Sequence, residues 1–155
     1  MTLPVSPADE CQAMLTWSEI RLCDAEIETL SIHGRVDAVF DSIYSNLWSR
    51  ARSSGYPVPE ENPNISMMLF GAKLAGLSPG QTAMVMELMY FVCKNRHQPK
   101  LEVGMFPRVL SIAQELAHLS WAGNRDEGAL KHRLLATHIL VQRGAQGIIE
   151  TCQVS

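Results

Sequence analysis

Hydrophobic positions recur at three- and four-residue steps over most of this chain, which is the spacing of amphipathic helices. The pattern is clearest over residues 64–97. Asn64 is a suitable N-cap there, apolar residues follow it at helical spacing, and Gly76 can adopt the positive φ that ends many helices. The pattern therefore predicts a helix over about residues 65–75.

A second helix is predicted directly after this one, over about residues 79–95. Ser78 and Gln81 form an S-x-x-Q capping box, and the proline between them suits the first position of a helix. Residues 84–93 are apolar except for Glu87. A helix that is apolar nearly all round is usually buried, so we expect the 79–95 helix to lie at the centre of the fold.

Two helices are predicted before this pair. A serine cap and Pro7 start the first, and its helical spacing continues to about Leu30. Gly34 breaks the pattern, and the next helix follows over about residues 35–53. The connection over residues 54–63 contains three prolines and a glycine, so it is either an ordered cross-connection or a flexible linker.

Further helices are predicted after the pair. Residues 101–106 alternate at first and favour a short extended piece, Pro107 begins another helix, and Asp126 can cap the last long one. The length suits one domain. We therefore predict an all-α fold, a compact single-domain bundle of five to seven helices over residues 1–155.

Charge is distributed unevenly within the net value of −3. Residues 1–62 carry ten acidic and four basic side chains, whereas residues 63–155 carry six acidic and nine basic ones. An acidic helical pair (6–53) is thus followed by the proline-rich connection and by the central and C-terminal helices (64–150). The asymmetry is typical either of a partner surface or of two solvated faces. The negative total argues mildly against nucleic acid as the main partner.

The cysteines and the N-terminus indicate the compartment. Cys11, Cys23, Cys93 and Cys152 form no C-x-x-C pair, so they predict neither a zinc site nor a redox motif. The first ten residues lack the features of a signal peptide, and no apolar run is long enough to span a membrane. We expect a cytoplasmic protein with no membrane contact, whose cysteines are buried thiols.

No pattern in the sequence predicts catalysis. Residues 76–80 match the G-x-S-x-G elbow of serine hydrolases, but a helix precedes them and Pro79 lacks the N–H that the oxyanion hole requires. Glu115 and His118 have the E-x-x-H spacing of di-iron bundles, which need a second such pair that this chain lacks. We predict no enzymatic activity, no cofactor and no metal site.

The leading hypothesis is a regulatory or adaptor protein that works through protein–protein contacts and forms a homodimer. It rests on the absence of catalytic motifs, the methionine-rich central pair and the acidic first segment. Methionine suits promiscuous binding grooves, and tryptophan is enriched in binding hot spots, although core packing is the alternative role for each. The candidate partner-binding residues are Trp17, Trp48, Met67, Met68 and Trp121.

The alternative hypothesis is a helix-turn-helix transcription regulator that reads DNA with the 64–95 helix pair. Small and turn residues fall roughly where that motif places them. The second helix offers no lysine or arginine before Lys94, however, and such residues commonly read base edges. The candidate nucleic-acid-binding residues are Lys73, Ser78, Gln81, Thr82, Lys94, Arg96 and Lys100.

Overall fold

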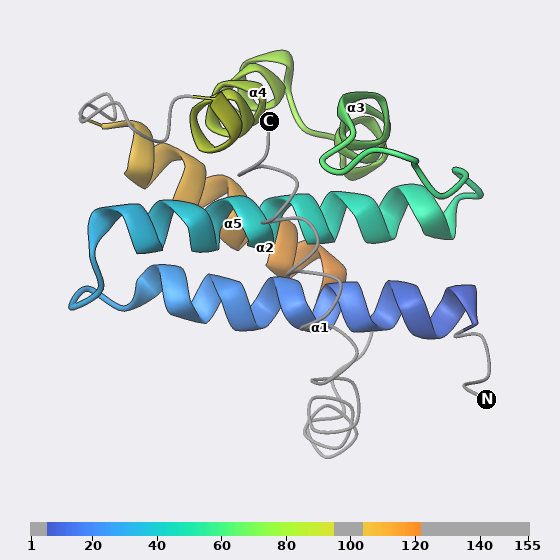
Figure 1. Ribbon diagram of the computed structural model, residues 1–155, viewed down its shortest axis with the longest axis horizontal. Helices are drawn as coiled ribbons and strands as arrows, with labels where there is room; N and C mark the ends of the chain where they lie inside the picture. Colours follow the sequence, from blue (N-terminus) through green and yellow to red (C-terminus); the bar gives the residue numbers. More distant parts are fainter. Residues whose placement is uncertain (1–5, 95–103, 122–155) are drawn as a thin grey trace.

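A computed structural model describes residues 6–94 and 104–121, which form five α-helices and no strand (Figure 1). The helices are α1 (Pro7–Glu26), α2 (Ile32–Ser53), α3 (Ile65–Ala75), α4 (Pro79–Lys94) and α5 (Met105–Trp121). The predicted all-α class is confirmed for this part of the chain. The helix predicted from Asp126 lies outside the described residues.

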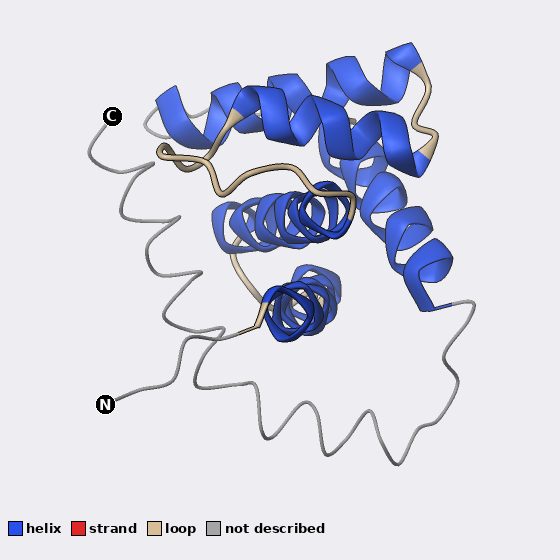
Figure 2. Cartoon of the chain, turned by 90° about the vertical axis from the view of Figure 1, so that its right-hand side faces the viewer, coloured by secondary structure: helices blue, strands red, loops and turns tan. Residues whose placement is uncertain are grey.

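Helix α2 runs through the middle of the described structure. Helices α1 and α2 form an antiparallel hairpin, and α3 and α4 lie next to each other in a layer that crosses one side of α2 (Figure 1 and Figure 2). Helix α5 crosses the hairpin on another side and contacts α1, α2 and α4. Because α2 contacts all four other helices, it holds the described fold together.

The central helix is therefore α2, and not the 79–95 helix that the sequence pattern predicts. Fourteen of the 22 residues of α2 are buried, against four of the 16 residues of α4. The pattern misleads because α2 mixes polar and apolar residues, whereas α4 is almost wholly apolar. Burial requires neighbours on every side of a helix, and the buried residues of α4 lie on one side only.

Polar residues are tolerated in the interior of the hairpin because hydrogen bonds join α1 and α2 in both directions. The Ser18 hydroxyl donates to the Ser42 carbonyl oxygen at 2.6 Å. The Ser49 hydroxyl donates to the Cys11 carbonyl oxygen at 2.9 Å. A buried polar group with such a partner avoids the desolvation cost of an unpaired one, so α1 and α2 can pack closely through a polar interface.

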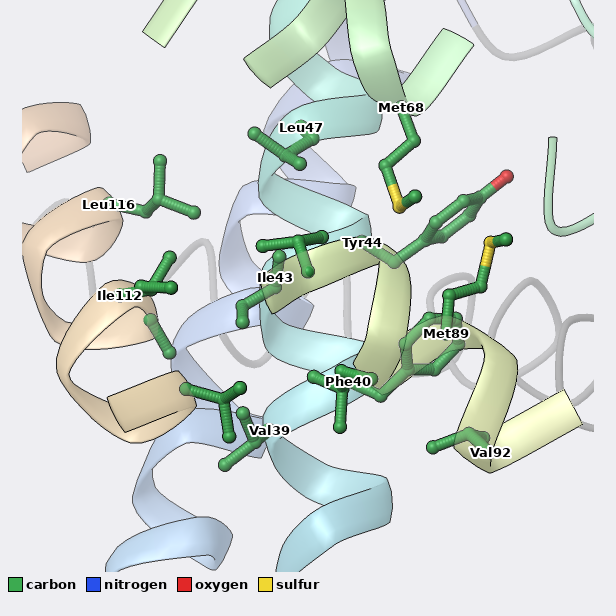
Figure 3. Close-up of a cluster of buried hydrophobic side chains, with 14 of the residues drawn as sticks. Val39, Phe40, Ile43, Tyr44, Leu47, Met68, Met89, Val92, Ile112 and Leu116 are labelled. Carbon is green, nitrogen blue, oxygen red and sulfur yellow. The ribbon is translucent and has the colours of Figure 1, made fainter. Parts of the chain in front are cut away.

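The remaining sides of α2 carry large apolar residues. Figure 3 shows Tyr44 of α2 between Met68 of α3 and Met89 of α4, with Ile112 and Leu116 of α5 at the other end of the cluster. Methionine fills irregular gaps, and its sulfur makes favourable contacts with aromatic rings. These two methionines therefore fill the core between α2, α3 and α4.

Helix α3 packs very closely on α2 because residue 71 is a glycine. A Cβ atom at Gly71 would clash with the carbonyl group of Leu47 and would lie 3.0 Å from the Leu47 Cα. Only a residue without a side chain allows this approach of the two backbones. The contact also fixes the rotation of α3, so that Met67, Met68 and Ala72 are buried with Gly71.

Most helix ends follow the capping signals in the sequence. The Asn64 side chain accepts a hydrogen bond from the Met67 N–H at 2.9 Å, and Gly76 ends α3 with a φ of 74°. At the start of α4, Ser78 Oγ accepts from the Gln81 N–H at 3.1 Å, and Gln81 Oε1 accepts from the Ser78 N–H at 2.9 Å. The predicted capping box is confirmed.

The predicted boundary between the first two helices is wrong. Helix α1 ends at Glu26 rather than near Leu30, and α2 begins at Ile32, so Gly34 lies in its first turn. The Ser31 side chain caps α2 by accepting a hydrogen bond from the Gly34 N–H at 3.1 Å. This serine cap outweighs the helix-breaking tendency of the glycine.

Helix α5 begins at Met105, two residues before the proline that was expected to start it. The first N–H groups of a helix have no intrahelical acceptor, so Pro107 is tolerated within the first turn. The extended piece expected over residues 101–106 is wrong for the last two of them, and residues 101–103 lie outside the described part.

Residues 54–63 form an ordered connection rather than a free linker. The ring of Tyr56 packs on the ring of Phe70, with 5.5 Å between the centroids. The hydroxyl of the buried Tyr44 accepts a hydrogen bond from the Asn64 N–H at 3.0 Å. These contacts fix the start of α3 and hence the placement of the α3–α4 layer on α2.

Candidate protein-interaction face

Helix α3 has more apolar side chains than its contacts with the rest of the fold can cover. Gly71 turns one side of the helix toward α2, and the opposite side faces outward. Ile65 and Leu69 are 47% and 40% exposed, and the exposed Lys73 continues the same stripe at a four-residue step. Helix α3 therefore presents a stripe of two large apolar residues and one cation.

Helix α4 presents a second outward stripe in the same layer. Ala83, Glu87 and Tyr90 recur at steps of four and three residues on the side opposite to the buried residues of α4. Tyr90 is 59% exposed, the largest exposed fraction among the bulky apolar side chains of the described helices. The exposed Lys94 extends this stripe at its C-terminal end.

We call the two stripes together the outer face of the α3–α4 layer. Its residues are Ile65, Leu69, Lys73, Ala83, Glu87, Tyr90 and Lys94. The face combines exposed apolar area with charges of both signs. Exposed apolar residues that gather on one side of a protein are typical of an interaction site, whereas isolated ones need no explanation.

Three of the predicted partner-binding residues lie in the core, and their prediction as surface anchors is wrong. Met67 and Met68 are fully buried against α2. Trp48 is only 6% exposed, and the Arg52 guanidinium covers its ring at 5.7 Å from the centroid. All three were chosen for residue type, and residue type does not distinguish the buried side of a helix from the exposed one.

The other two predicted anchors lie elsewhere. Trp17 on α1 is half-buried, and Arg21 lies over its ring at 5.7 Å from the centroid. Its indole N–H is buried without a hydrogen-bond acceptor among the described residues. Trp121 is the last residue of α5, and its side chain lies outside the described part. Trp17 is not part of the outer face of the α3–α4 layer.

The predicted DNA-reading residues that the structure describes do not form one basic surface. Ser78 and Gln81 cap α4, and the Gln81 side-chain amide donates to Glu115 Oε2 at 2.8 Å. This carboxylate at the start of α4 would repel a phosphate. Thr82 is half-buried, whereas Lys73 and Lys94 are exposed on different helices. Two further candidates lie outside the described residues, namely Arg96 and Lys100.

The packing of α3 and α4 also differs from a helix-turn-helix. Each helix makes its main contacts with α2, and α4 has further contacts with α5. The two helices thus rest side by side on a third helix instead of forming a unit of their own.

An open cavity of about 400 Å³ lies beside the C-terminal end of α2. Its lining includes Leu15, Leu74, Leu119 and Arg50. Burial lowers the pKa of the Arg50 guanidinium below its ordinary value, and its Nε donates to the Asn46 side chain at 2.8 Å. Arg50 is thus held in place by a hydrogen bond within α2. The lining of the cavity has no nucleophile beside a base.

The cysteines give no sign of reactivity in the described part. Cys11 is buried and Cys93 is half-buried. Cys23 is exposed, which corrects the expectation of a buried thiol, and Cys152 lies outside the described residues. Partial burial and then the nearby carboxylates, of which Glu26 acts most, raise the pKa of the Cys23 thiol and so disfavour the thiolate.

The described residues contain neither a candidate metal cluster nor a candidate membrane span. Over 6–94 and 104–121, no three histidine, cysteine or acidic side chains stand close enough together to hold a metal ion. None of the five helices is both long enough and apolar enough to cross a bilayer.

No protein-family model, curated protein or solved structure gives a significant match to this chain. Its function is therefore inferred from its own surface and chemistry. Of the exposed apolar residues Ile65, Leu69 and Tyr90, the last was expected in the core with the rest of the 79–95 helix. Glu87 was the available signal, because a lone charge in an apolar helix marks the solvent side, and Tyr90 lies on that side.

Proposed function

We propose that this chain is a cytoplasmic, non-enzymatic regulatory or adaptor protein that acts through protein–protein contacts and forms a homodimer. The observation that carries the proposal is the exposure of Ile65, Leu69 and Tyr90 on one layer of the fold. Transfer of such side chains out of water favours association by about 25 cal/mol per Å² of apolar surface. The outer face of the α3–α4 layer is the dimer interface in this proposal.

A second copy of the chain suits this face because its charges are of both signs. In a twofold interface the same patch meets itself, so it must be complementary to itself. Glu87 and Lys94 are exposed on α4 and Lys73 is exposed on α3, and a twofold axis can bring the carboxylate of one copy toward a lysine of the other. A patch with charges of one sign only would repel its copy.

The solution mass of the full chain, measured by light scattering, tests the proposal. We expect twice the mass of one chain. Leu69→Lys would bury a lysine at the interface and should raise the dimer dissociation constant at least about tenfold. Val58→Lys is the matched control, because Val58 is an exposed apolar residue that lies in the connection and is not part of the outer face, and this variant should remain a dimer.

Two results would overturn the homodimer. One is a wild-type chain with the mass of a monomer over the whole concentration range. The other is a Leu69→Lys variant that dimerises as well as the Val58→Lys control, since the interface would then lie elsewhere.

The alternative, a helix-turn-helix regulator of transcription, has less support. Its proposed DNA-reading surface carries Glu115 beside Gln81, and its cations are divided between two helices. The same light-scattering measurement with mixed-sequence duplex DNA at low and moderate salt tests it. A salt-sensitive complex that Lys73→Glu weakens would favour the regulator.

A further inference from the structure

The turn between α1 and α2 exposes a cluster of large apolar side chains at the end of the hairpin. Ile27, Leu30 and Ile32 are each between 43% and 46% exposed, and all lie within six consecutive residues. Turns normally use glycine, proline, asparagine, aspartate or serine. We call residues 27–32 the hairpin tip. It lies at one end of the hairpin, whereas the α3–α4 layer crosses its side (Figure 1).

The hairpin tip has a defined conformation. The Ile27 N–H donates to the Asp24 carbonyl oxygen at 3.1 Å, and the Leu30 N–H donates to the Ile27 carbonyl oxygen at 3.2 Å. The Ser31 cap then starts α2. Because the backbone is held on both sides, a partner would have to order these side chains but not the main chain that carries them.

The surroundings of the hairpin tip are acidic. Glu26 and Glu28 are exposed within or directly beside it. The neighbouring Cys23 thiol is subject to the same negative charge. Burial raises its pKa most, and the carboxylates of Glu26, Glu19 and Asp24 raise it further.

The two arginines nearest to the hairpin tip in sequence make their contacts with other groups of the protein. Arg21 forms ion pairs with Asp24 and Asp41, at 2.7 and 3.0 Å. Arg35 donates to the Ala25 carbonyl oxygen at 2.8 Å, and its guanidinium carbon lies 4.6 Å from the centre of the Phe106 ring. Apart from the exposed His33, which is formally neutral at pH 7, the exposed charge of residues 26–33 is therefore carboxylate, which repels nucleic acid and anionic lipid and attracts cations.

We propose that the hairpin tip is the docking site for a basic amphipathic helix of a partner protein. The apolar side of that helix would cover Ile27, Leu30 and Ile32, and its lysines or arginines would meet Glu26 and Glu28. This contact is separate from the dimer interface proposed above. An adaptor needs such a second surface, since its first is used for the second copy.

Fluorescence anisotropy of a labelled amphipathic peptide of leucine and lysine, titrated with the full chain, tests the proposal. A peptide with glutamate in place of lysine is the charge control. We expect the lysine peptide to bind with an affinity that falls as salt is added, and the glutamate peptide to bind at least about tenfold more weakly.

The double variant Leu30→Ser, Ile32→Ser should weaken binding of the lysine peptide at least about tenfold. Val58→Ser removes an equally exposed apolar side chain elsewhere and should change the affinity less than about twofold. Glu26→Gln with Glu28→Gln should weaken binding several-fold at low salt and reduce its salt dependence. Circular dichroism checks that each variant keeps its helices, which we expect because the substituted side chains are exposed.

The proposal is overturned if the wild-type chain does not bind the lysine peptide, or if Val58→Ser weakens binding as much as the tip variant does. It is also overturned if the tip variant changes the solution mass of the chain, since a second copy would then occupy the tip. A monomeric wild-type chain that binds the peptide through the tip would remove the homodimer and leave this inference intact.

Discussion

The α1–α2 hairpin and the α3–α4 layer differ in how the composition of a helix relates to its burial. Helix α2 has serine, asparagine and aspartate among its residues, yet it is the most buried helix of the described structure. Helix α4 is almost wholly apolar, yet Tyr90 and its neighbours face outward. The polar helix is enclosed because its side chains find partners, and the apolar helix is exposed because its outward side has no neighbour among the described residues.

Apolar composition and burial are therefore separate properties of a helix. In the hairpin, small and hydroxyl-bearing side chains such as Ser18 and Ser42 allow the two helices to approach and bond to each other. In the layer, apolar side chains exceed the contact area that α2 and α5 offer. The excess apolar surface is available to a partner, and for this reason we propose the dimer interface on the layer.

The close contact of Gly71 with Leu47 decides which side of α3 is buried, and we expect its loss to lower the free energy of unfolding more than the other changes below. Gly71→Ala places a Cβ atom against the Leu47 carbonyl group, and neither backbone can yield as a side chain could. We expect the free energy of unfolding to fall by about 3 kcal/mol, which is the upper end of the usual cost of overpacking. Urea denaturation measures this change.

The matched control is Gly80→Ala in the first turn of α4. The nearest atom to a Cβ there is Ser78 Oγ at 3.9 Å, which is ordinary contact. This variant should gain about 0.4–1 kcal/mol, because alanine restricts the unfolded chain. If both variants had the same stability, the close approach of α3 to α2 would not be what sets the orientation of the layer.

Much of the fold could be predicted from the sequence because helix ends are encoded locally. The caps at Asn64 and Ser78 and the left-handed Gly76 are each decided by a few neighbouring residues. The centre of the fold could not be predicted in the same way. It depends on whether a serine on one helix of the hairpin meets a carbonyl oxygen on the other helix, 24 or 38 residues away along the chain.

The outer face of the layer could be predicted only in part. Its apolar residues were recognised as helical, and Tyr90 was expected in the core with the rest of the 79–95 helix, whereas Lys73 and Lys94 were predicted to bind DNA. The orientation of α3 depends on Gly71, and its fit against Leu47 is a contact between distant residues. Met67 and Met68 were proposed as binding residues because of their type, whereas their position beside Gly71 makes them core residues.

A smaller effect is expected from the ion pair inside the hairpin. Arg21 Nε lies 3.0 Å from Asp41 Oδ2, and the Asp41 side chain is buried. Arg21→Met keeps the length of the side chain but removes the cation, and we expect a loss of about 2 kcal/mol in urea denaturation, less than for a fully buried pair because Arg21 is partly exposed.

The double variant Arg21→Met, Asp41→Asn sharpens this test. It removes the charge that would otherwise be left in the interior, so it should recover part of the lost stability. If the double variant were less stable than Arg21→Met alone, the desolvated carboxylate would not be the cause. The polar interior of the hairpin would then depend on the shape of its side chains more than on their charge.

The smallest effect concerns Glu19 on α1, a half-buried acid of the hairpin. Burial raises the pKa of the Glu19 carboxyl above its ordinary value. The folded state therefore disfavours the carboxylate, and this cost is present above the raised pKa. As the pH falls through that value the folded chain takes up the proton more readily than the unfolded chain, and the cost disappears.

Glu19→Gln should therefore stabilise the chain at pH 7, by less than about 1 kcal/mol because the side chain is partly solvated. The difference from the wild type should shrink as the pH is lowered toward 4, and thermal unfolding at both pH values measures it. Glu28→Gln in the hairpin tip is the control: its exposed carboxylate loses little water on folding, so the same change should have little effect at either pH. A gain for Glu19→Gln that persisted at low pH would point to packing of the glutamine rather than to the buried charge.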